Sequence, residues 1–551
     1  MRTTTLILAL CTINASAQYL VEGRYLHPTG TSNAWAIVAD PAGNIIIGGQ
    51  VENDIDFDPG PGVAMVTIIG DGDGYVCKLD PSGGFQWVAQ FGGDETQLEW
   101  VQDLVTDAAG NIYVAGAFGG TADFDPGAGV TQLSGGGQDG YLVKLSPAGE
   151  LIWAKDIGGS GTDALSGLAM TAAGEILVCG YVQPDAYVDG NTIPLGNTQN
   201  GGLVASFQPD GTFNWARVLP GNGGRNVTDV YEGPDGGIHG CGIFSTTLDL
   251  DPGPGSFPVV AVGDAEGFYF KLDAAGGFLW GGRFGGILED WGYDMDVDQD
   301  GAMYLAGHFR AAATIGYGAD TTQIPITTTS DALIARIDPD GTVAWAYGIP
   351  AGGRSHSVRA TNDGEVLYSG YFTNTVDFDL GPGVAQVTSQ GGNDMFLARY
   401  TTGGAFVSVF TISGVSGQTG RGLFIDDANV IYASGYSSGV VDLHPGTEVL
   451  SDTAQSTASF YVRLEGDLST AVTELDATTT FYPNPVRAGQ LLTTGLGTGQ
   501  VRILDTAGRV HMDLGKVSGD GPIAVDLPEG TYLLEWKDGR KQVVRRFVVG
   551  R

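Results

Sequence analysis

Short apolar runs of strand length, bounded by Gly, Pro, Asp and Asn, follow one another along most of this chain. Such runs predict β-strands separated by turns. One typical stretch holds a strand and turn (QDLVTDAAGN), a strand ending at glycine (IYVAGAF), a third strand (GYLVKL), a turn (SPAG) and a fourth strand (LIWAKDIGG). No stretch of ten or more residues carries an apolar stripe at helical spacing. Each unit is therefore expected to be a four-stranded antiparallel meander.

The unit recurs at a nearly constant interval. Glycines that close the second strand lie 62–67 residues apart, at Gly49, Gly116, Gly180, Gly242, Gly307, Gly370 and Gly435. Tryptophans of the fourth strand lie 62–66 residues apart, at Trp87, Trp153, Trp215, Trp280 and Trp345. Such sheets bury their faces against their neighbours and leave few edges when they are arranged around an axis. The repeats predict an all-β fold, a seven-bladed β-propeller of four-stranded antiparallel blades.

The ends of the repeat array favour a closed propeller over the alternative, an open solenoid of the same units. The seventh unit reaches its third strand at Phe460–Leu464, and no tryptophan strand follows it. The missing strand is at the other end, because Leu20–Leu26 aligns with Gln86–Gly92, 66 residues later. We therefore expect the first strand to pair as the outermost strand of the last blade.

Residues 1–17 have the parts of a secretory signal peptide: Arg2, an apolar core at Leu6–Leu10, and an Ala15-Ser16-Ala17 cleavage site. This segment is too short for a spanning helix, and no other segment has eighteen unbroken apolar residues. A secreted or cell-surface protein without a transmembrane segment is therefore expected, with its propeller in residues 18–470.

Charge and cysteine content narrow the classes of partner. The net charge is −37, and residues 471–551 hold ten Lys/Arg and nine Asp/Glu, so the excess of acid lies in the propeller. A negative charge of this size disfavours nucleic acid as a partner. Removal of the signal peptide takes Cys11 and leaves Cys77, Cys179 and Cys241, an odd number that cannot form a complete disulfide framework. We interpret these three as small buried residues rather than redox or metal residues.

The repeats stop near Leu464, and a polar linker at 471–480 leads into a different region. Residues 481–551 predict a small all-β domain with strands at 500–504, 523–527, 531–536 and 542–549. Four motifs follow one another there: FYPNPV, VRILDTAGRV, LPEGTYLLEW and a basic strand ending in RRFVV.

In these motifs the region resembles the type A C-terminal sorting domain of cargo of the Bacteroidota type IX secretion system. The chain departs from that pattern only by the additional Gly550-Arg551 at its end. The resemblance implies an immunoglobulin-like β-sandwich that is recognised by the outer-membrane export machinery. Its motif residues here are Pro483, Asn484, Pro485, Gly530, Thr531 and Tyr532. The repeats also resemble the propeller repeats often found in such cargo, which implies an architecture but no ligand.

A DFDPG segment recurs in the loops after the second strands. Its copies begin at Asp56, Asp123, Asp249 and Asp377, with an altered copy at Asp442. Alternating carboxylates of this kind are possible calcium ligands, but two are few for a site that needs six to eight oxygens. Asp followed by Pro-Gly is also ordinary turn chemistry. We interpret the segment as a turn, with calcium as the alternative.

Six third strands carry a basic residue in register: Lys78, Lys144, Lys271, Arg336, Arg399 and Arg463. Four of them follow an aspartate five residues earlier, at Asp73, Asp139, Asp331 and Asp394. A ring of cations could bind an anionic ligand. Repetition from blade to blade instead favours either ion pairs within each blade or side chains whose apolar stems are buried while their charged ends reach solvent.

The chain shows no nucleophile with an ordered base, no phosphate loop and no metal quartet, so we predict no catalytic, cofactor-binding or metal-binding residue. The predicted function is a non-catalytic binding or adhesion propeller for a surface glycan or protein ligand, exported through its C-terminal domain. The alternatives are a secreted carbohydrate-active hydrolase or lyase with a site in the axial depression, and a purely structural surface protein. A clustered, non-repeating set of His, Tyr, Arg and carboxylates at one pole would favour the enzyme.

Overall fold

The fold is described from a computed structural model, in which all regular elements of the described residues are β-strands. The structure describes residues 19–465 except 27–30, 61, 94–97, 189, 194–199, 440, 442 and 444–453. In the C-terminal region it describes 486–487, 490–492, 499–505, 510–517, 523–525, 527, 530–538 and 541–550. The predicted signal peptide and the linker at 471–480 lie outside the described residues.

The predicted meander is present in consecutive sets of four antiparallel strands. In one set, β8 (Trp100–Thr106), β9 (Ile112–Asp123), β10 (Gln132–Leu145) and β11 (Leu151–Gly158) pair in chain order. The set before it is β2 (Ser32–Ala39), β3 (Ile45–Val51), β6 (Asp73–Leu79) and β7 (Phe85–Gly93). The set after it is β12 (Ala164–Met170), β13 (Ile176–Val182), β16 (Gly201–Phe207) and β17 (Phe213–Leu219).

The same order continues along the chain. The next set is β19 (Arg225–Glu232), β20 (Ile238–Phe244), β23 (Glu266–Leu272) and β24 (Phe278–Gly285). It is followed by β25 (Trp291–Val297), β26 (Met303–Phe309), β29 (Asp331–Ile337) and β30 (Val343–Ile349), and then by β31 (Arg354–Ala360), β32 (Glu365–Phe372), β35 (Asp394–Thr401) and β36 (Phe406–Ile412). The residues between second and third strands form short hairpins that the sequence did not predict, such as β27 (Ala313–Tyr317) with β28 (Asp320–Ile324).

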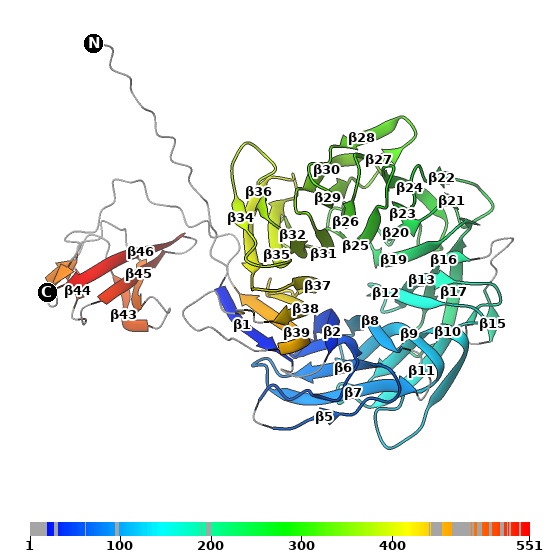
Figure 1. Cartoon of the computed structure of the whole chain (residues 1–551), viewed down its shortest axis with the longest axis horizontal. Coiled ribbons are helices and arrows are strands. Elements are labelled where there is room, and N and C mark those ends of the chain that lie inside the picture. The colour runs from blue at the N-terminus through cyan, green and yellow to red at the C-terminus, as the bar shows by residue number, and fades with distance from the viewer. Residues whose placement is uncertain are drawn as a thin grey trace, which may run out of the picture. The chain divides into compact units, whose positions relative to one another are not determined.

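The last set is completed by the first strand of the chain. Its order is β1-β39-β38-β37, from β1 (Tyr19–Tyr25), β39 (Ala454–Glu465), β38 (Ile431–Gly439) and β37 (Gln418–Ile425). Just after β1, Leu26 is fully buried and its N–H donates to the carbonyl oxygen of Ser459 at 3.0 Å. Figure 1 shows β1, in blue, beside β39, in orange. The predicted pairing of the first strand with the last unit is confirmed.

A backbone bulge in the first strand of each set explains the glycine that marks the repeat. The register of β8 with β9 shifts between Val101 and Asp103, and a Cβ on Gly116 would overlap the carbonyl oxygen of Trp100. Only glycine lets the bulged strand approach so closely. The same overlap with a first-strand carbonyl occurs at Gly49, Gly180, Gly242, Gly307, Gly370 and Gly435.

In four of the sheets the repeated tryptophan forms a hydrogen bond to the following sheet. Trp153 Nε1 donates to the carbonyl oxygen of Pro209 at 3.3 Å, in the turn between the third and fourth strands of the following sheet. Lys144 Nζ donates to the same oxygen at 3.1 Å. The indole also packs against Gly211, which has a φ of +84°. A Cβ at this position would lie 3.1 Å from the indole ring, closer than an ordinary contact. Equivalent tryptophan bonds join Trp87 to Pro147, Trp280 to Pro339 and Trp345 to Thr402, at 3.2, 3.0 and 3.0 Å.

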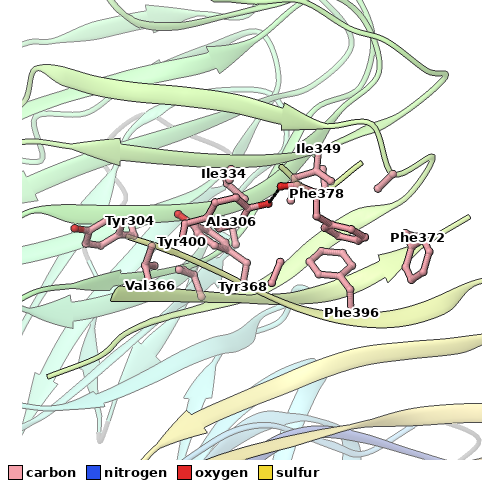
Figure 2. Close-up of a cluster of buried hydrophobic side chains, with 14 of the residues drawn as sticks. Tyr304, Ala306, Ile334, Ile349, Val366, Tyr368, Phe372, Phe378, Phe396 and Tyr400 are labelled. Atoms are coloured by element: carbon pink, nitrogen blue, oxygen red, sulfur yellow. Dashed lines mark hydrogen bonds between the residues drawn. The ribbon is translucent and has the colours of Figure 1, made fainter. Parts of the chain in front are cut away.

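The apolar core lies between neighbouring sheets, as Figure 2 shows for the sheets that contain β26 and β32. Phe378 of one DFDPG-like segment inserts into this core and is fully buried, and Tyr400 Oη donates to its carbonyl oxygen at 3.0 Å. The apolar residues at the same place in the other copies are also fully buried: Phe57, Phe124, Leu250 and Leu443. Cys77, Cys179 and Cys241 are free and fully buried, in agreement with their interpretation as small core residues.

The described residues between 486 and 550 belong to a second compact unit. One of its sheets has the order β40-β46-β45-β42-β43, from β40 (Val486–Arg487), β46 (Lys541–Gly550), β45 (Gly530–Asp538), β42 (Gly499–Asp505) and β43 (Val510–Val517). A second sheet pairs β41 (Gln490–Leu492) with β44 (Ile523–Val525). The four predicted strands are present, whereas β43 was not predicted. Among the described residues, no helix is long and apolar enough to cross a membrane.

Candidate functional site

The first strands of the sheets enclose a cavity of about 650 Å³. Contacts run in the order β2, β8, β12, β19, β25, β31 and β37, and β37 in turn contacts β2. Two equivalent positions of every strand line the cavity. One position holds Trp35, Gln102, Ser166, Thr228, Tyr293, His356 and Arg421, and the other holds Val38, Val105, Ala169, Tyr231, Asp296, Arg359 and Phe424. The wall is therefore built from equivalent positions whose residues differ in size and charge.

Carboxylates next to the bulges tie the strands of the wall together. Asp103 Oδ2 accepts the N–H of Leu168 on the next strand at 2.8 Å. In the same way Asp294 Oδ2 accepts the N–H of Val358 at 2.8 Å. The third member of the set, Asp229, accepts the N–H of Met295 at 3.1 Å. These aspartates therefore connect neighbouring strands and also line the cavity.

Arg359 is the cation of this acidic group. Its Nη1 lies 2.8 Å from Asp294 Oδ2. Burial opposes the charge on Arg359, but the surrounding aspartates Asp294, Asp296, Asp229 and Asp103 outweigh it and raise the pKa of the guanidinium. One arginine is therefore surrounded by four acids.

The pKa values of these acids are raised, whereas the pKa of a carboxylate in a simple ion pair is lowered. Burial raises the pKa of Asp103 to about 7 and that of Asp296 to about 6, although Arg359 lowers both. Burial, followed by the charge of Asp294, holds the pKa of Asp229 well above its usual range. At neutral pH this part of the cavity therefore carries fewer negative charges than its four carboxyl groups suggest.

A second group, of aromatic and basic side chains, comes from β25, β26, β31 and β32. Arg354 Nη1 donates to Tyr293 Oη at 2.6 Å and lies 5.9 Å from the centre of that ring. The ring centre of His356 lies 4.9 Å from that of Tyr293, and His308 stacks on Tyr293 at 5.6 Å. The remaining members are Trp291 and Tyr371, whose ring centres lie 5.7 Å from Tyr293 and 5.6 Å from His356.

His356 is placed to accept a proton or a hydrogen bond. Its Nδ1 lies 2.9 Å from the carbonyl oxygen of Gly420, which can only accept, so Nδ1 carries the proton and Nε2 has a free lone pair. Burial, followed by the nearby charge of Arg421, holds the pKa of His356 well below its usual range. Burial likewise lowers the pKa of His308 to about 3. Both imidazoles are therefore neutral at physiological pH.

The DFDPG segments have the hydrogen bonds of a turn. Asp56 Oδ1 accepts the N–H groups of Asp58 and Ala64 at 3.1 and 2.7 Å, and Asp58 Oδ1 accepts that of Gly60 at 2.7 Å. The copies at Asp123, Asp249 and Asp377 repeat this pattern. No group of three or more metal-ligating side chains is found in the described part of the chain.

The basic residues of the third strands form ion pairs within their own sheets. Lys78, for example, lies 2.8 Å from Asp40. The other pairs are Lys144–Asp107 at 3.6 Å, Lys271–Asp235 at 2.6 Å, Arg336–Asp338 at 3.1 Å and Arg399–Glu365 at 3.3 Å. The sixth, Arg463, donates to the carbonyl oxygen of Pro81 at 3.3 Å. The aspartates five residues earlier do not serve as partners; Asp73 and Asp394, for instance, accept loop N–H groups at 2.8 Å.

The sorting-domain residues fall partly within the described region. Gly530, Thr531 and Tyr532 begin β45. Pro483, Asn484 and Pro485 lie outside the described residues.

The cavity residues were not identified from the sequence. Tyr293, His356 and Arg421 occupy one aligned position, but they are 63 and 65 residues apart and belong to no linear motif. The available signal was variation at an aligned position rather than a motif. Around the repeat glycine the units agree, whereas at this position the aligned residues change from aromatic to amide, hydroxyl, imidazole and guanidinium.

Comparison with known proteins places the chain among propeller repeat proteins. The family described as "Beta-propeller repeat" (SBBP) matches residues 86–117, from β7 into β9. An uncharacterized WD repeat-containing protein of Acanthamoeba polyphaga mimivirus is 22% identical over 440 residues, which cover 61% of this chain. The matched part spans 30% of that relative. These matches and the four-stranded antiparallel sheets support a propeller repeat protein.

Solved structures with a similar fold include an enzyme and a non-enzyme domain. Virginiamycin B lyase from Staphylococcus aureus gives a TM-score of 0.38 at 11% identity, with 82% of this chain and 100% of that chain covered. The Neurospora crassa Pan2 WD40 domain gives a TM-score of 0.37 at 10% identity, with 80% and 90% covered. At this level of similarity no function is transferred from either protein.

Proposed function

We propose that the chain is a seven-bladed propeller whose axial cavity binds a small ligand. The observation that carries the proposal is the wall itself, in which one of the two equivalent positions holds a different residue on every strand. Residues that maintain the architecture recur from unit to unit. A set of residues that does not recur therefore points to another role, such as ligand recognition. A cavity of about 650 Å³ with apolar, aromatic and charged walls also has the size of a ligand site.

Two observations support seven blades. The first strands contact one another in a cycle that returns from β37 to β2. The N-terminal β1 supplies the outer strand that the last unit lacks. This arrangement removes the open edges that a linear array of sheets would expose.

A binding screen tests the ligand proposal directly. Residues 18–551 are applied to glycan and protein arrays, with calcium and with chelator. The matched variant is Gln102→Trp, which adds bulk to the wall at the position where β2 already carries Trp35. A ligand that binds the original protein and not the variant supports the axial site. Ligands that bind both equally would place recognition elsewhere and overturn the proposal.

We further propose that the protein is exported and delivered to the cell surface or released there. The support comes from the sequence: a signal-peptide pattern in residues 1–17 and four sorting-domain motifs in residues 481–551. The partner is the type IX export machinery. Truncation after Thr470 should leave the protein in the periplasm, and fusion of residues 471–551 to an unrelated exported protein should carry that protein to the surface. Surface delivery of the truncated chain would refute this part.

A second candidate function is a carbohydrate-active hydrolase or lyase. The aromatic and basic group favours it, because His356 offers a neutral Nε2 as a base and Tyr293 offers a hydroxyl bonded to Arg354. Oligosaccharides incubated with the protein would be assayed for new reducing ends and, for a lyase, for an unsaturated product. His356→Gln retains a donor for Gly420 but no base, so it should abolish turnover. Equal rates in both proteins would exclude this site.

A further inference from the structure

Several described lysines and arginines of this acidic chain have an acid partner. Eight of them lie 2.5–3.7 Å from a carboxylate oxygen: Lys78, Lys144, Lys271, Arg283, Arg310, Arg336, Arg359 and Arg399. With 63 Asp/Glu to 26 Lys/Arg, acids are in excess. A partly buried arginine without an acid partner therefore raises the question of what compensates its charge.

Two such arginines, Arg354 and Arg421, lie beside the same pair of side chains. Neither forms an ion pair with a carboxylate among the described residues, and Arg421 Nε is buried without a hydrogen-bond partner. Both guanidinium charges act on Tyr293 and on His356. Tyr293, His356 and Arg421 line the cavity, and Arg354 is bonded to Tyr293.

Partly buried charges in proteins are normally paired, because an unpaired one loses hydration without compensation. The planar guanidinium matches the geometry of a carboxylate or sulfate through two parallel hydrogen bonds. We propose that Arg354 and Arg421 bind the anionic group of an acidic sugar, a carboxylate or sulfate carried on a saccharide that occupies the axial cavity. This inference rests on the proposed ligand-binding function and names the class of its ligand.

The surroundings of the two arginines favour a sugar over an acidic peptide. Trp291 lines the cavity and offers aromatic surface against which a sugar ring packs, and His356 Nε2 can accept a hydrogen bond from a hydroxyl. The cavity has room for a short saccharide rather than for a folded partner. The two histidines add no charge of their own at neutral pH, so the binding of the anion depends on the arginines.

The test measures binding to the complete chain without its signal peptide by calorimetry, in a buffer free of phosphate and sulfate. The probes are trigalacturonate, neutral maltotriose, a sulfated disaccharide and a hexaglutamate peptide. The variants are Arg421→Met, Arg354→Met and Arg421→Lys. The matched control is Arg217→Met, an arginine elsewhere in the propeller that donates to Ala275 and stacks on Trp215.

We expect trigalacturonate or the sulfated disaccharide to bind, and either Met variant to weaken binding at least tenfold. Arg421→Lys should lose less affinity, because it retains the positive charge but not the two parallel N–H donors of the guanidinium. Arg217→Met should bind like the original protein. Preference between the two acidic sugars identifies the anionic group. Maltotriose binding that Gln102→Trp abolishes and Arg421→Met spares would overturn the anion site while leaving the axial site in place. Tighter binding of hexaglutamate would overturn the sugar assignment, and absence of binding by every probe would overturn the inference.

Discussion

The joints between sheets and the wall of the axial cavity are built from the same repeats, yet they differ in how strictly they repeat. At the joints Trp87, Trp153, Trp280 and Trp345 each donate to the same kind of turn carbonyl. In the wall one aligned position runs from Trp35 to Arg421 without a constant feature. Repetition thus marks the contacts that hold the propeller together, and its absence marks the surface open to specialisation.

The comparison predicts that changes to repeated contacts affect stability and that changes in the wall affect recognition. The largest loss should follow deletion of residues 18–27. Removing β1 exposes the edge of β39 and empties the site of Leu26, which alone is worth about 3 kcal/mol. Thermal unfolding should show a lower midpoint and lower cooperativity.

The control for this deletion is truncation after Thr470, which retains β1 and β39. It should leave the unfolding midpoint of the propeller unchanged. Equal stability of the chain with and without residues 18–27 would mean that the last sheet does not need the first strand.

A repeated glycine should be the next most sensitive position. In Gly307→Ala the new Cβ would overlap the carbonyl oxygen of Trp291, so the unfolding free energy should fall by about 1–3 kcal/mol or more. Chemical denaturation measures the loss. Gly224→Ala is the matched control, because Gly224 is exposed and its nearest neighbour is Ser245 Oγ at 3.7 Å. A similar loss in both variants would show that the bulge contact is not the cause.

Substitution of a tryptophan at a joint between sheets should destabilise the protein more than substitution of a tryptophan in the cavity wall. Trp153→Phe removes the indole donor to Pro209 and should cost about 1 kcal/mol. Trp280→Phe breaks the equivalent bond to Pro339 and should cost the same. Trp35→Phe changes the cavity wall and should leave the melting temperature nearly unchanged. If Trp35→Phe proved the most destabilising of the three, the distinction between joint and wall would fail.

A change of pH should alter stability in opposite directions through the acids of the two regions, and the effect should be smaller than those above. Burial raises the pKa of Asp103 to about 7, so the folded state retains a proton that the unfolded chain has lost, and stability falls as the pH rises from about 4 to 7. Asp103→Asn can still accept the N–H of Leu168 and should remove this decline. Melting curves across pH 4–7 measure the slope.

Asp40, the acid partner of Lys78, should behave in the opposite way. Burial of Asp40 is outweighed by hydrogen bonds from Lys78 and Asn44, which lower its pKa. Its contribution is therefore complete above about pH 4 and is lost as the pH falls below that value. Asp40→Asn should reduce stability at neutral pH and should weaken the dependence of stability on pH below about pH 4. The same pH dependence in both asparagine variants would contradict the assignment.

The sequence predicted the scaffold because a few residues have local physical reasons to be fixed. Gly116 must lack a Cβ beside the bulge of β8, and Trp153 must reach the following turn, so both leave a period that can be read directly. The candidate site left no such trace. Tyr293, His356 and Arg421 meet only because three strands from different repeats converge on one axis, and chemistry that depends on convergence has no linear signature. The bulges and the short hairpins were likewise visible only in three dimensions.

Pairing of β1 with β39 also has a consequence for the order in which the chain can fold. Each meander consists of strands near one another in sequence, so most sheets can form as soon as their own residues are available. The last sheet instead joins Leu26 to Ser459, which closes a loop of more than 400 residues. The entropy of closing such a loop is recovered only when the intervening sheets have already brought the two ends together. Closure is therefore the final step, and β1 waits as an unpaired edge until residues 454–465 have been synthesised.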